Sequence, residues 1–364
     1  IESFYSGDGR STINNRGNAI YNRIRWITTD GMSVTTHKVI ADFTQPTAGT
    51  TQKYYYRVGR PGYWSTERSF TMRNRSDVIT NGFNFCQVTD QQGFKGEEYE
   101  TWKLSANFIV NDKINHGYDF VINTGDIAQN GNRINEWLDY FNGGNNMFQD
   151  TEQMFVIGNN DLCKVDPSVL IDGSDTSKVN SYYINYFFTY EYPYTIPYAT
   201  NGKYVDSVYS FIYGNTYFLA MNSEITTTTS QTIFGDANIG DTYKLINTWC
   251  TNDLTNIDSN ITHKIAYCHD APITLVGANL MYSFVNADLS VNTSVKRGGS
   301  HLNTVGNYWF TPFLESNGFK VCIAGHKHTY LTTRLVKENP SATMQPYVYD
   351  ADYIPPEGST AATY

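Results

Sequence analysis

The feature that most constrains the fold is an alternation of short apolar stretches with longer stretches of helical spacing, which begins near residue 78. The apolar stretches are typical of buried strands, and they lie at the end of 78–90 and at 119–126, 152–161, 264–270 and 320–330. Apolar residues recur at helical spacing at 97–115, 132–144, 241–257 and 303–318. A hairpin is predicted over 207–224. This order predicts an α/β (α+β) fold, in which helices cover a buried sheet.

Residues 1–76 have a different texture, with alternating, β-branched and aromatic segments separated by turn signals such as Thr-Asp-Gly and Arg-Pro-Gly. This pattern predicts a small all-β sandwich. We therefore predict two domains, 1–76 and 77–364. Within the second domain, 164–205 and 271–302 have no clear periodicity and are predicted to be a surface insertion and a long loop.

The composition excludes some classes of protein. The formal net charge is −9, and the cations form no basic stripe, so nucleic-acid binding is disfavoured. No apolar run approaches the ~20 residues needed to span a bilayer. The chain begins at Ile1 rather than Met, which a removed leader or a trimmed chain would explain. Sequons at Asn74, Asn260 and Asn292 are consistent with a secreted or lumenal glycoprotein.

The chain has five cysteines. Cys86, Cys268 and Cys322 lie in short apolar runs and are predicted to be core thiols. Whether Cys163 and Cys250 form a disulfide is left open by the sequence.

Each predicted strand of the second domain ends in a loop rich in metal-ligating residue types. In chain order these residues are Asp90, Gln92, Asp126, Gln129, Asn159, Asn160, Asp161, His269, His326 and His328. In α/β sheets, function collects just beyond the carboxyl ends of the strands, so these side chains are expected to share one cleft. Carboxylates, amides and imidazoles in this number suit two divalent or trivalent metal ions that share a bridging carboxylate.

The same residues resemble the calcineurin-like metallophosphoesterases and, within them, the purple acid phosphatase group. The family motifs run D-x-[HG], GD-x-x-Y, GN-H-[DE], a strand-end H and GH-x-H. The matching stretches here are 90–93, 125–129, 158–161, 268–270 and 325–330. The resemblance covers about residues 20–335. It implies a four-layer metallophosphoesterase sandwich preceded by a small all-β fibronectin-III-like sandwich at 1–76.

The resemblance also implies roles for individual residues. Asp126 would bridge the two metal ions, with Asp90 and His328 on metal one. Metal two would be held by Asn159, His269 and His326. The ions would be Fe, Zn or Mn, and the reaction would be hydrolysis of phosphate esters by attack of a metal-bridging hydroxide.

Three positions depart from the family pattern. Gln129 stands where the group has the tyrosine that binds ferric iron, and Gln92 stands at the second D-x-[HG] position. Either glutamine is a candidate to complete metal one. Asn160 replaces the family histidine that acts on the leaving group, and an amide is not a general acid.

Other residues are candidates to supply the missing acid, namely Asp161, Asp270 and His301. For His301 a plain loop histidine is the competing interpretation. The remaining histidines, His37, His116 and His263, are predicted to be structural or surface residues.

Two functions follow from these observations. The first is a dinuclear metal-dependent phosphoesterase, similar to acid phosphatases, that acts on a phosphate ester substrate. The alternative is a catalytically weakened phosphoesterase fold that serves as a structural or surface-assembly component, which the altered positions and the low charged fraction of 17% would suit. A homo-oligomer or an extracellular assembly is compatible with either.

Overall fold

The computed structural model describes most of the second predicted domain and part of the first. The described residues are 20–27, 33–40, 43–93, 96–131, 133–161, 187–188, 208–224, 239–271, 273–275, 295–297, 310–326, 328, 336–338 and 347–349. Most of the predicted insertion at 164–205, most of the predicted loop at 271–302, Cys163, Asn292 and His301 lie outside them.

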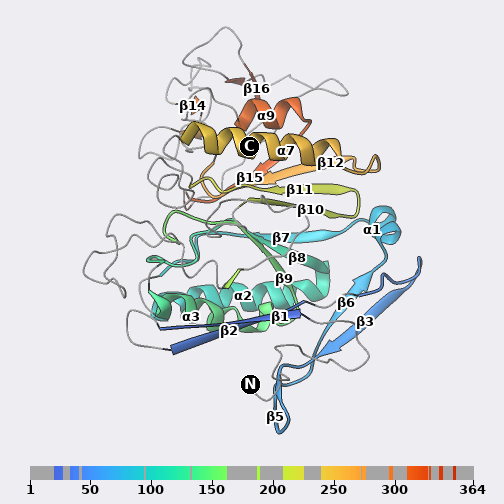
Figure 1. Ribbon diagram of the computed structural model, residues 1–364, viewed down its shortest axis with the longest axis vertical. Coiled ribbons are helices and arrows are strands. Elements are labelled where there is room, and N and C mark those ends of the chain that lie inside the picture. The colour runs from blue at the N-terminus through green and yellow to red at the C-terminus, as the bar shows by residue number, and fades with distance from the viewer. Residues whose placement is uncertain are drawn as a thin grey trace.

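Two sheets lie face to face at the centre of the molecule (Figure 1). The first is parallel and has the order β7 (Asn84–Val88), β8 (Tyr118–Asn123), β9 (Glu152–Phe155). The second has the order β10 (Tyr209–Tyr213), β11 (Thr216–Ala220), β12 (His263–Tyr267), β15 (Val321–Ile323). The β10–β11 pair is antiparallel, as the predicted hairpin requires, and the other pairs are parallel.

Both faces of the central strand β8 are apolar, because each packs against a different layer. Phe120 and Ile122 point toward the second sheet, where Phe120 meets Phe218 edge-on at 5.5 Å between ring centroids. Val121, one residue out of phase, packs against the helices on the other side. Side chains alternate between the faces of a strand, so a continuous apolar run indicates a strand buried between two layers.

Helices cover the outer face of each sheet. The first sheet is covered by α2 (Gly96–His116), α3 (Ile134–Gly143) and α4 (Asn145–Phe148), and the second by α7 (Ile239–Thr255) and α9 (Phe310–Ser316). The result is the predicted four layers of helix, sheet, sheet and helix. The helical spacing of 97–115 predicts Trp102, Ala106, Phe108 and Ile109 as core positions, and for Phe108 this is wrong. Phe108 is 69% exposed, because it lies two residues, or about 200°, from the buried Ala106.

The predicted fibronectin-III-like sandwich is not shown by the described part of 1–76. Its strands form three two-stranded antiparallel sheets: β1 (Ile20–Ile27) with β2 (Ser33–Ile40), β3 (Thr51–Tyr56) with β6 (Arg68–Arg73), and β4 (Gly59–Arg60) with β5 (Tyr63–Trp64). That assignment and the boundary at residue 76 stay predictions. Arg73 pairs with Asp119 at 3.2 Å, which attaches the β3–β6 sheet to the first central sheet.

The remaining elements are short. Helix α1 (Arg75–Asn81) begins after Asn74, whose side chain accepts a hydrogen bond from the backbone of Ser76. The other described strands form the pairs β13 (Ile273–Leu275) with β14 (Val295–Arg297) and β16 (Val336–Glu338) with β17 (Tyr347–Tyr349). No helix within the described ranges is long and apolar enough to cross a membrane.

The described cysteines are free thiols. Cys268 and Cys322 are buried in the core as predicted, and Cys86 is half-buried. Cys250 is fully buried, and this burial raises the pKa of its thiol.

Candidate metal centre

The carboxyl ends of five parallel strands meet at one edge of the two sheets. Short backbone hydrogen bonds join the loops that follow them, including Asp90 N to Gly125 O at 2.9 Å and Gly325 N to His269 O at 2.8 Å. Contacts between the loops of the two sheets include His269 Nδ1 with Thr124 O at 2.7 Å and His326 N with Asp90 Oδ2 at 2.8 Å. The loops of both sheets therefore form a single connected structure around the predicted ligands.

Four predicted ligands have an unusual backbone conformation. In the part of the chain that the structure describes, the non-glycine residues with positive φ are Asp90 (55°), Asp126 (54°), His326 (73°) and His328 (50°). This left-handed region is strained for residues other than glycine, and such strain concentrates at functional sites. All four belong to the set that the sequence predicted as metal ligands, and one lies in each of the loops after β7 and β8 and two in the loop after β15.

Asp126 is 1% exposed and several donors surround its carboxylate. The backbone N–H of Asn160 donates to Oδ1 and its side-chain amide donates to Oδ2, both at 2.8 Å. Oδ2 also lies 3.3 Å from His269 Nε2. Burial opposes ionisation of Asp126, but contact with His269 and Asn160 lowers the pKa of the carboxyl below its usual value. The carboxylate is thus held ionised and fixed in orientation.

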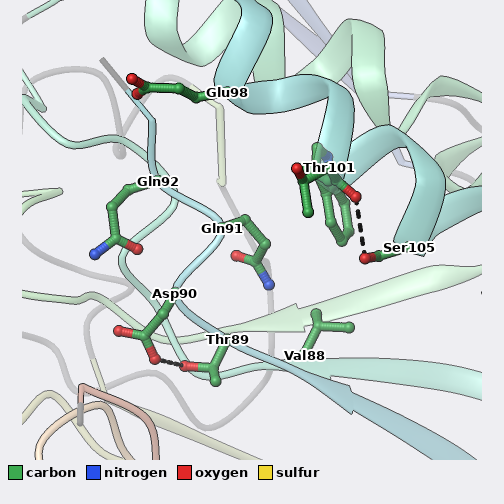
Figure 2. A pocket seen from close by; sticks show the side chains of 9 residues that line it. Val88, Thr89, Asp90, Gln91, Gln92, Glu98, Thr101 and Ser105 are labelled. Carbon is green, nitrogen blue, oxygen red and sulfur yellow. Dashed lines mark hydrogen bonds between the residues drawn. The ribbon is translucent and has the colours of Figure 1, made fainter. Parts of the chain in front are cut away.

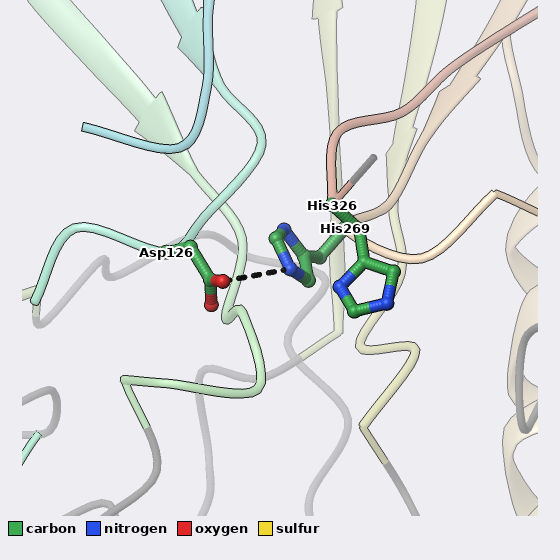
Figure 3. Close-up of side chains that lie close together, drawn as sticks. All are labelled: Asp126, His269 and His326. Carbon is green, nitrogen blue, oxygen red and sulfur yellow. Dashed lines mark ion pairs between the residues drawn. The ribbon is translucent and has the colours of Figure 1, made fainter. Parts of the chain in front are cut away.

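His269 is fully buried and both of its ring nitrogens have defined neighbours. Donation from Nδ1–H to the Thr124 carbonyl directs Nε2 at the site, where Asn159 Oδ1 lies 3.2 Å away. Burial lowers the pKa of the imidazole, yet the neighbouring Asp126 carboxylate raises it to about 9. Figure 3 shows Asp126, His269 and His326 directed toward one another, and one ligand atom from each lies within 4.8 Å of the others.

A second group of ligands surrounds Asp90. Asp90 Oδ2 accepts hydrogen bonds from Thr89 Oγ1 at 2.5 Å and from the backbone of His326 at 2.8 Å. Its other oxygen, Oδ1, is buried without a hydrogen-bond partner and lies 3.3 Å from His328 Nε2. A buried carboxylate oxygen without a hydrogen bond is costly unless a cation occupies the space beside it.

Gln92 lies between the two groups. Its site-facing amide atom is 3.1 Å from His328 Nε2 and 3.3 Å from Asp126 Oδ2. Hydrogen bonding identifies this atom as Oε1, because the other amide atom then donates to the backbone oxygens of Asp126 and Asp90. Gln129, the alternative candidate, instead directs its amide at Asn160 Oδ1 at 3.5 Å.

Asp161 does not occupy the role of a substitute acid. It is fully buried, and its carboxylate accepts hydrogen bonds from the backbone N–H groups of Asp126, Ile127, Ala128 and Gly158 at 2.8–3.0 Å. Burial and the charge of Asp126 raise the pKa of Asp161 to about 7. Because both oxygens are occupied by loop amides, Asp161 organises the ligand loops rather than facing a substrate.

The structure assigns no acid role to the other two candidates, Asp270 and His301. Asp270 is 6% exposed, and its backbone N–H donates to Ser223 Oγ at 2.9 Å. His301 lies outside the described residues. His116 pairs with Asp112 on exposed α2 surface, in agreement with its predicted surface role.

Two glycines allow the loops to approach so closely. A Cβ at Gly158 would lie 2.2 Å from both the backbone nitrogen and Oδ1 of Asp126. A Cβ at Gly325 would lie 1.9 Å from Thr89 Oγ1 and 2.7 Å from Asp90 Oδ2. Both contacts are shorter than any side chain tolerates, so each half of the centre depends on a glycine.

Comparison with known proteins agrees with this geometry. The calcineurin-like phosphoesterase family matches residues 84–330, which include every described candidate ligand. The chain belongs to the calcineurin-like phosphoesterase family.

Solved structures include similar chains. The purple acid phosphatase PPD1 from yellow lupin (Lupinus luteus) seeds is 14% identical, with a TM-score of 0.47, and the match covers 87% of this chain. The chain spans 55% of the length of that protein. No curated protein matches the chain.

The residues of this calcineurin-like phosphoesterase fit bound metal ions. Carboxylates, imidazoles and amide oxygens are the donors that Zn, Mn and Fe accept. The buried Asp90 Oδ1, which accepts no hydrogen bond, and the site-facing His269 Nε2 are atoms that a cation would complete. The structure therefore contains a possible metal-ligand cluster of the kind the family uses.

Several residues outside the sequence motifs also shape this candidate site. Thr89 and Thr124 orient Asp90 and His269, and the charge of Glu224 helps raise the pKa of His269. Glu224 is buried in the loop after β11, whose strand lies parallel to β12. The sequence does contain a signal for Glu224, because the apolar run of β11 is followed by the polar residues Asn222 to Glu224, as the ligand-bearing strands are followed by polar loops.

A cavity of about 280 Å³ lies beside Asp90, between the end of β7 and the first turns of α2 (Figure 2). Gln91 points to the α2 side of the loop, whereas Asp90 and Gln92 point to the opposite side. Of these three successive side chains, Gln91 therefore lies on the α2 side of the loop, and only Asp90 and Gln92 are available to the metal centre.

Proposed function

We propose that the chain is a dinuclear metal-dependent phosphoesterase that hydrolyses phosphate esters. The observation that carries this proposal is the pair of ligand groups that share one carboxylate. Asp126 Oδ2 lies 3.3 Å from His269 Nε2 on one side and 3.3 Å from the Gln92 amide on the other. One carboxylate contacting ligands of both groups is what a bridging ligand requires.

The first group would be completed by Asp90, Gln92 and His328, and the second by Asn159, His269 and His326. The choice of Gln92 over Gln129 rests on its position between His328 and Asp126. With no phenolate among these ligands, the donor set favours Zn, Mn or Fe(II).

Two bound metal ions would supply positive charge at the developing phosphoryl transition state and activate water for attack. The protein's own contribution is orientation. Thr124 holds the His269 tautomer, Asn160 holds the Asp126 carboxylate, and Asp161 holds the backbone of two ligand loops. Groups fixed in this way do not need to reorganise during the reaction, which is the main source of electrostatic catalysis.

Asn160 shapes the expected substrate range. Its side chain donates to Asp126, and an amide does not release a proton to a leaving group. Esters with acidic leaving groups, such as aryl phosphates, are therefore expected to react faster than alkyl phosphates.

The test is elemental analysis of the purified chain, together with hydrolysis of p-nitrophenyl phosphate in the presence of added Zn, Mn or Fe. Two metal ions per chain and metal-dependent turnover are expected. Turnover that survives complete removal of metal by a chelator would contradict the proposal. Bound metal without turnover on any phosphate ester would favour the alternative of a structural or assembly role, which the amide at position 160 also suits.

A further inference from the structure

We propose that the chain associates head to tail with a second copy of itself, through a basic aromatic patch on the N-terminal strands and the exposed face of α2. The basic aromatic patch consists of Arg57, Arg60, Tyr63 and Trp64. The α2 face consists of Glu97, Glu100, Leu104 and Phe108. This inference does not depend on catalytic activity.

The basic aromatic patch is pre-organised for binding. The guanidinium of Arg57 lies 4.5 Å from the centre of the Trp64 ring, and that of Arg60 lies 4.4 Å from the centre of the Tyr63 ring. Stacking on a ring holds the guanidinium in place and leaves its N–H edge available to a carboxylate. Tyr63 is 70% exposed. Tyr, Trp and Arg are the residue types that dominate binding energy at protein interfaces.

The charge of this region is opposite to that of the chain. Residues 43–74 contain five cations and the single anion Glu67, whereas the chain as a whole carries −9. The described surface of the patch therefore attracts an acidic partner, and the rest of this chain is acidic.

The α2 face has the complementary chemistry. Leu104 is 70% exposed and Phe108 is 69% exposed, although both lie in the middle of a 21-residue helix. Glu97 and Glu100 precede them on the same side of the helix, because residues three and four apart are neighbours. Two carboxylates beside two apolar side chains match two guanidinium groups beside two aromatic rings.

Strand β3, which leads into the patch, lies near the C-terminal end of α2, whereas Glu97 and Glu100 lie at its N-terminal end, so the contact between two copies pairs unlike surfaces. Lys113, near the end of α2, donates to Asp150 O, and the neighbouring Gln149 O accepts from Tyr56 of β3. Glu100 is 13 residues back along the helix, or about 20 Å away at 1.5 Å per residue. A contact between unlike surfaces extends into open chains unless the rotation closes a ring.

The experiment is sedimentation velocity on the full chain over a range of concentrations, at about 20 mM and about 500 mM NaCl. The wild-type chain is expected to exceed its monomer mass of 41.3 kDa at least twofold at low salt and to dissociate at high salt. Arg57→Glu with Arg60→Glu should be monomeric, and so should Glu97→Lys with Glu100→Lys. Lys320→Glu, at an exposed lysine before β15, is the matched control and should behave as wild type.

Mixing the two reversed variants distinguishes this contact from other modes. The mixture should associate as the wild-type chain does, because the intact patch of one variant meets the intact α2 face of the other and the two reversed surfaces are also complementary. The chain that carries all four reversals should associate again, because the charges are exchanged. Tyr63→Ser and Phe108→Ser test the apolar part if a charge variant fails to fold. A wild-type chain that stays monomeric at low salt would overturn the proposal. A mixture of the two variants that stays monomeric would also overturn it.

Discussion

The half of the metal centre around Asp126 and His269 is buried, whereas the half around Asp90 and His328 opens to solvent. The side chains of Asp126 and His269 are 2% and 0% exposed, and that of His328 is 62% exposed. In the buried half, the Thr124 carbonyl fixes His269, and the Asn160 backbone N–H and the Asp161 carboxylate fix Asp126. In the open half, Asp90 is fixed by Thr89 and His326, but His328 contacts Asp90 and Gln92 from the surface.

In the proposed dinuclear centre, this difference would make the two metal ions unequally bound. A ligand that is already fixed loses little conformational entropy on binding, so the buried half is expected to bind its ion more tightly. The open half must order an exposed histidine, and it is expected to exchange its ion more readily. The predictions below test this inequality.

The largest effect is expected from Asp126→Asn, which removes the carboxylate that both halves share. Metal-dependent hydrolysis of p-nitrophenyl phosphate should fall by at least about 1,000-fold, and metal content should fall below one ion per chain. The control is Glu100→Gln on the exposed surface of α2, which should change neither. Retention of two ions by Asp126→Asn would show that the halves do not share this ligand.

The next largest effect is expected from removing one histidine from either half, which tests whether the two halves bind metal with different affinity. His328→Ala should leave one tightly bound ion per chain, because the buried half is intact. His269→Ala should weaken that tight ion by more than the ~10–100-fold that loss of an outer-shell contact costs. Metal titration by calorimetry measures both, and equal losses in the two variants would show that the halves are equivalent.

Asp161→Asn is expected to destabilise the fold itself. Four backbone N–H groups lose a charged acceptor in a fully buried position, and the new amide adds a donor facing them. The free energy of unfolding should fall by about 3 kcal/mol, as for other broken buried networks. Chemical denaturation of the metal-free chain gives the value, with Asp139→Asn on α3 as the control. A change below about 1 kcal/mol would mean that the loops do not depend on this carboxylate.

The smallest effects come from single orienting contacts. Thr89→Val removes one donor to Asp90, and Asn160→Ala removes one donor to Asp126 while its backbone donor stays. Each should weaken metal binding by up to about 10-fold, the first in the open half and the second in the buried half. Competition with a coloured chelator resolves the two sites. Asn160→His should in addition raise the rate on alkyl phosphates relative to p-nitrophenyl phosphate if proton donation limits the reaction.

The predicted central strands and their covering helices agree with the described structure because their signals are local, but helix α1 at the start of 78–90 was not predicted. Apolar runs such as 119–123 indicate strands buried on both faces, and α2 and α7 each lie within two residues of their predicted bounds. The exception, Phe108, is an apolar side chain on the solvent side of its helix, which composition alone does not distinguish from the core side.

The sequence by itself determined which residue types follow each strand, and so which side chains were available for a metal centre. Only the tertiary structure decided what each of them does. Gln92 and Gln129 are equivalent in sequence, but packing of the loops puts Gln92 against His328 and Gln129 against Asn160. Asp161 carries the same carboxyl group as Asp126, yet backbone amides from two loops surround it. The reason is physical: a residue's chemistry is local, whereas its neighbours across two sheets come from parts of the chain 35 to 236 residues away.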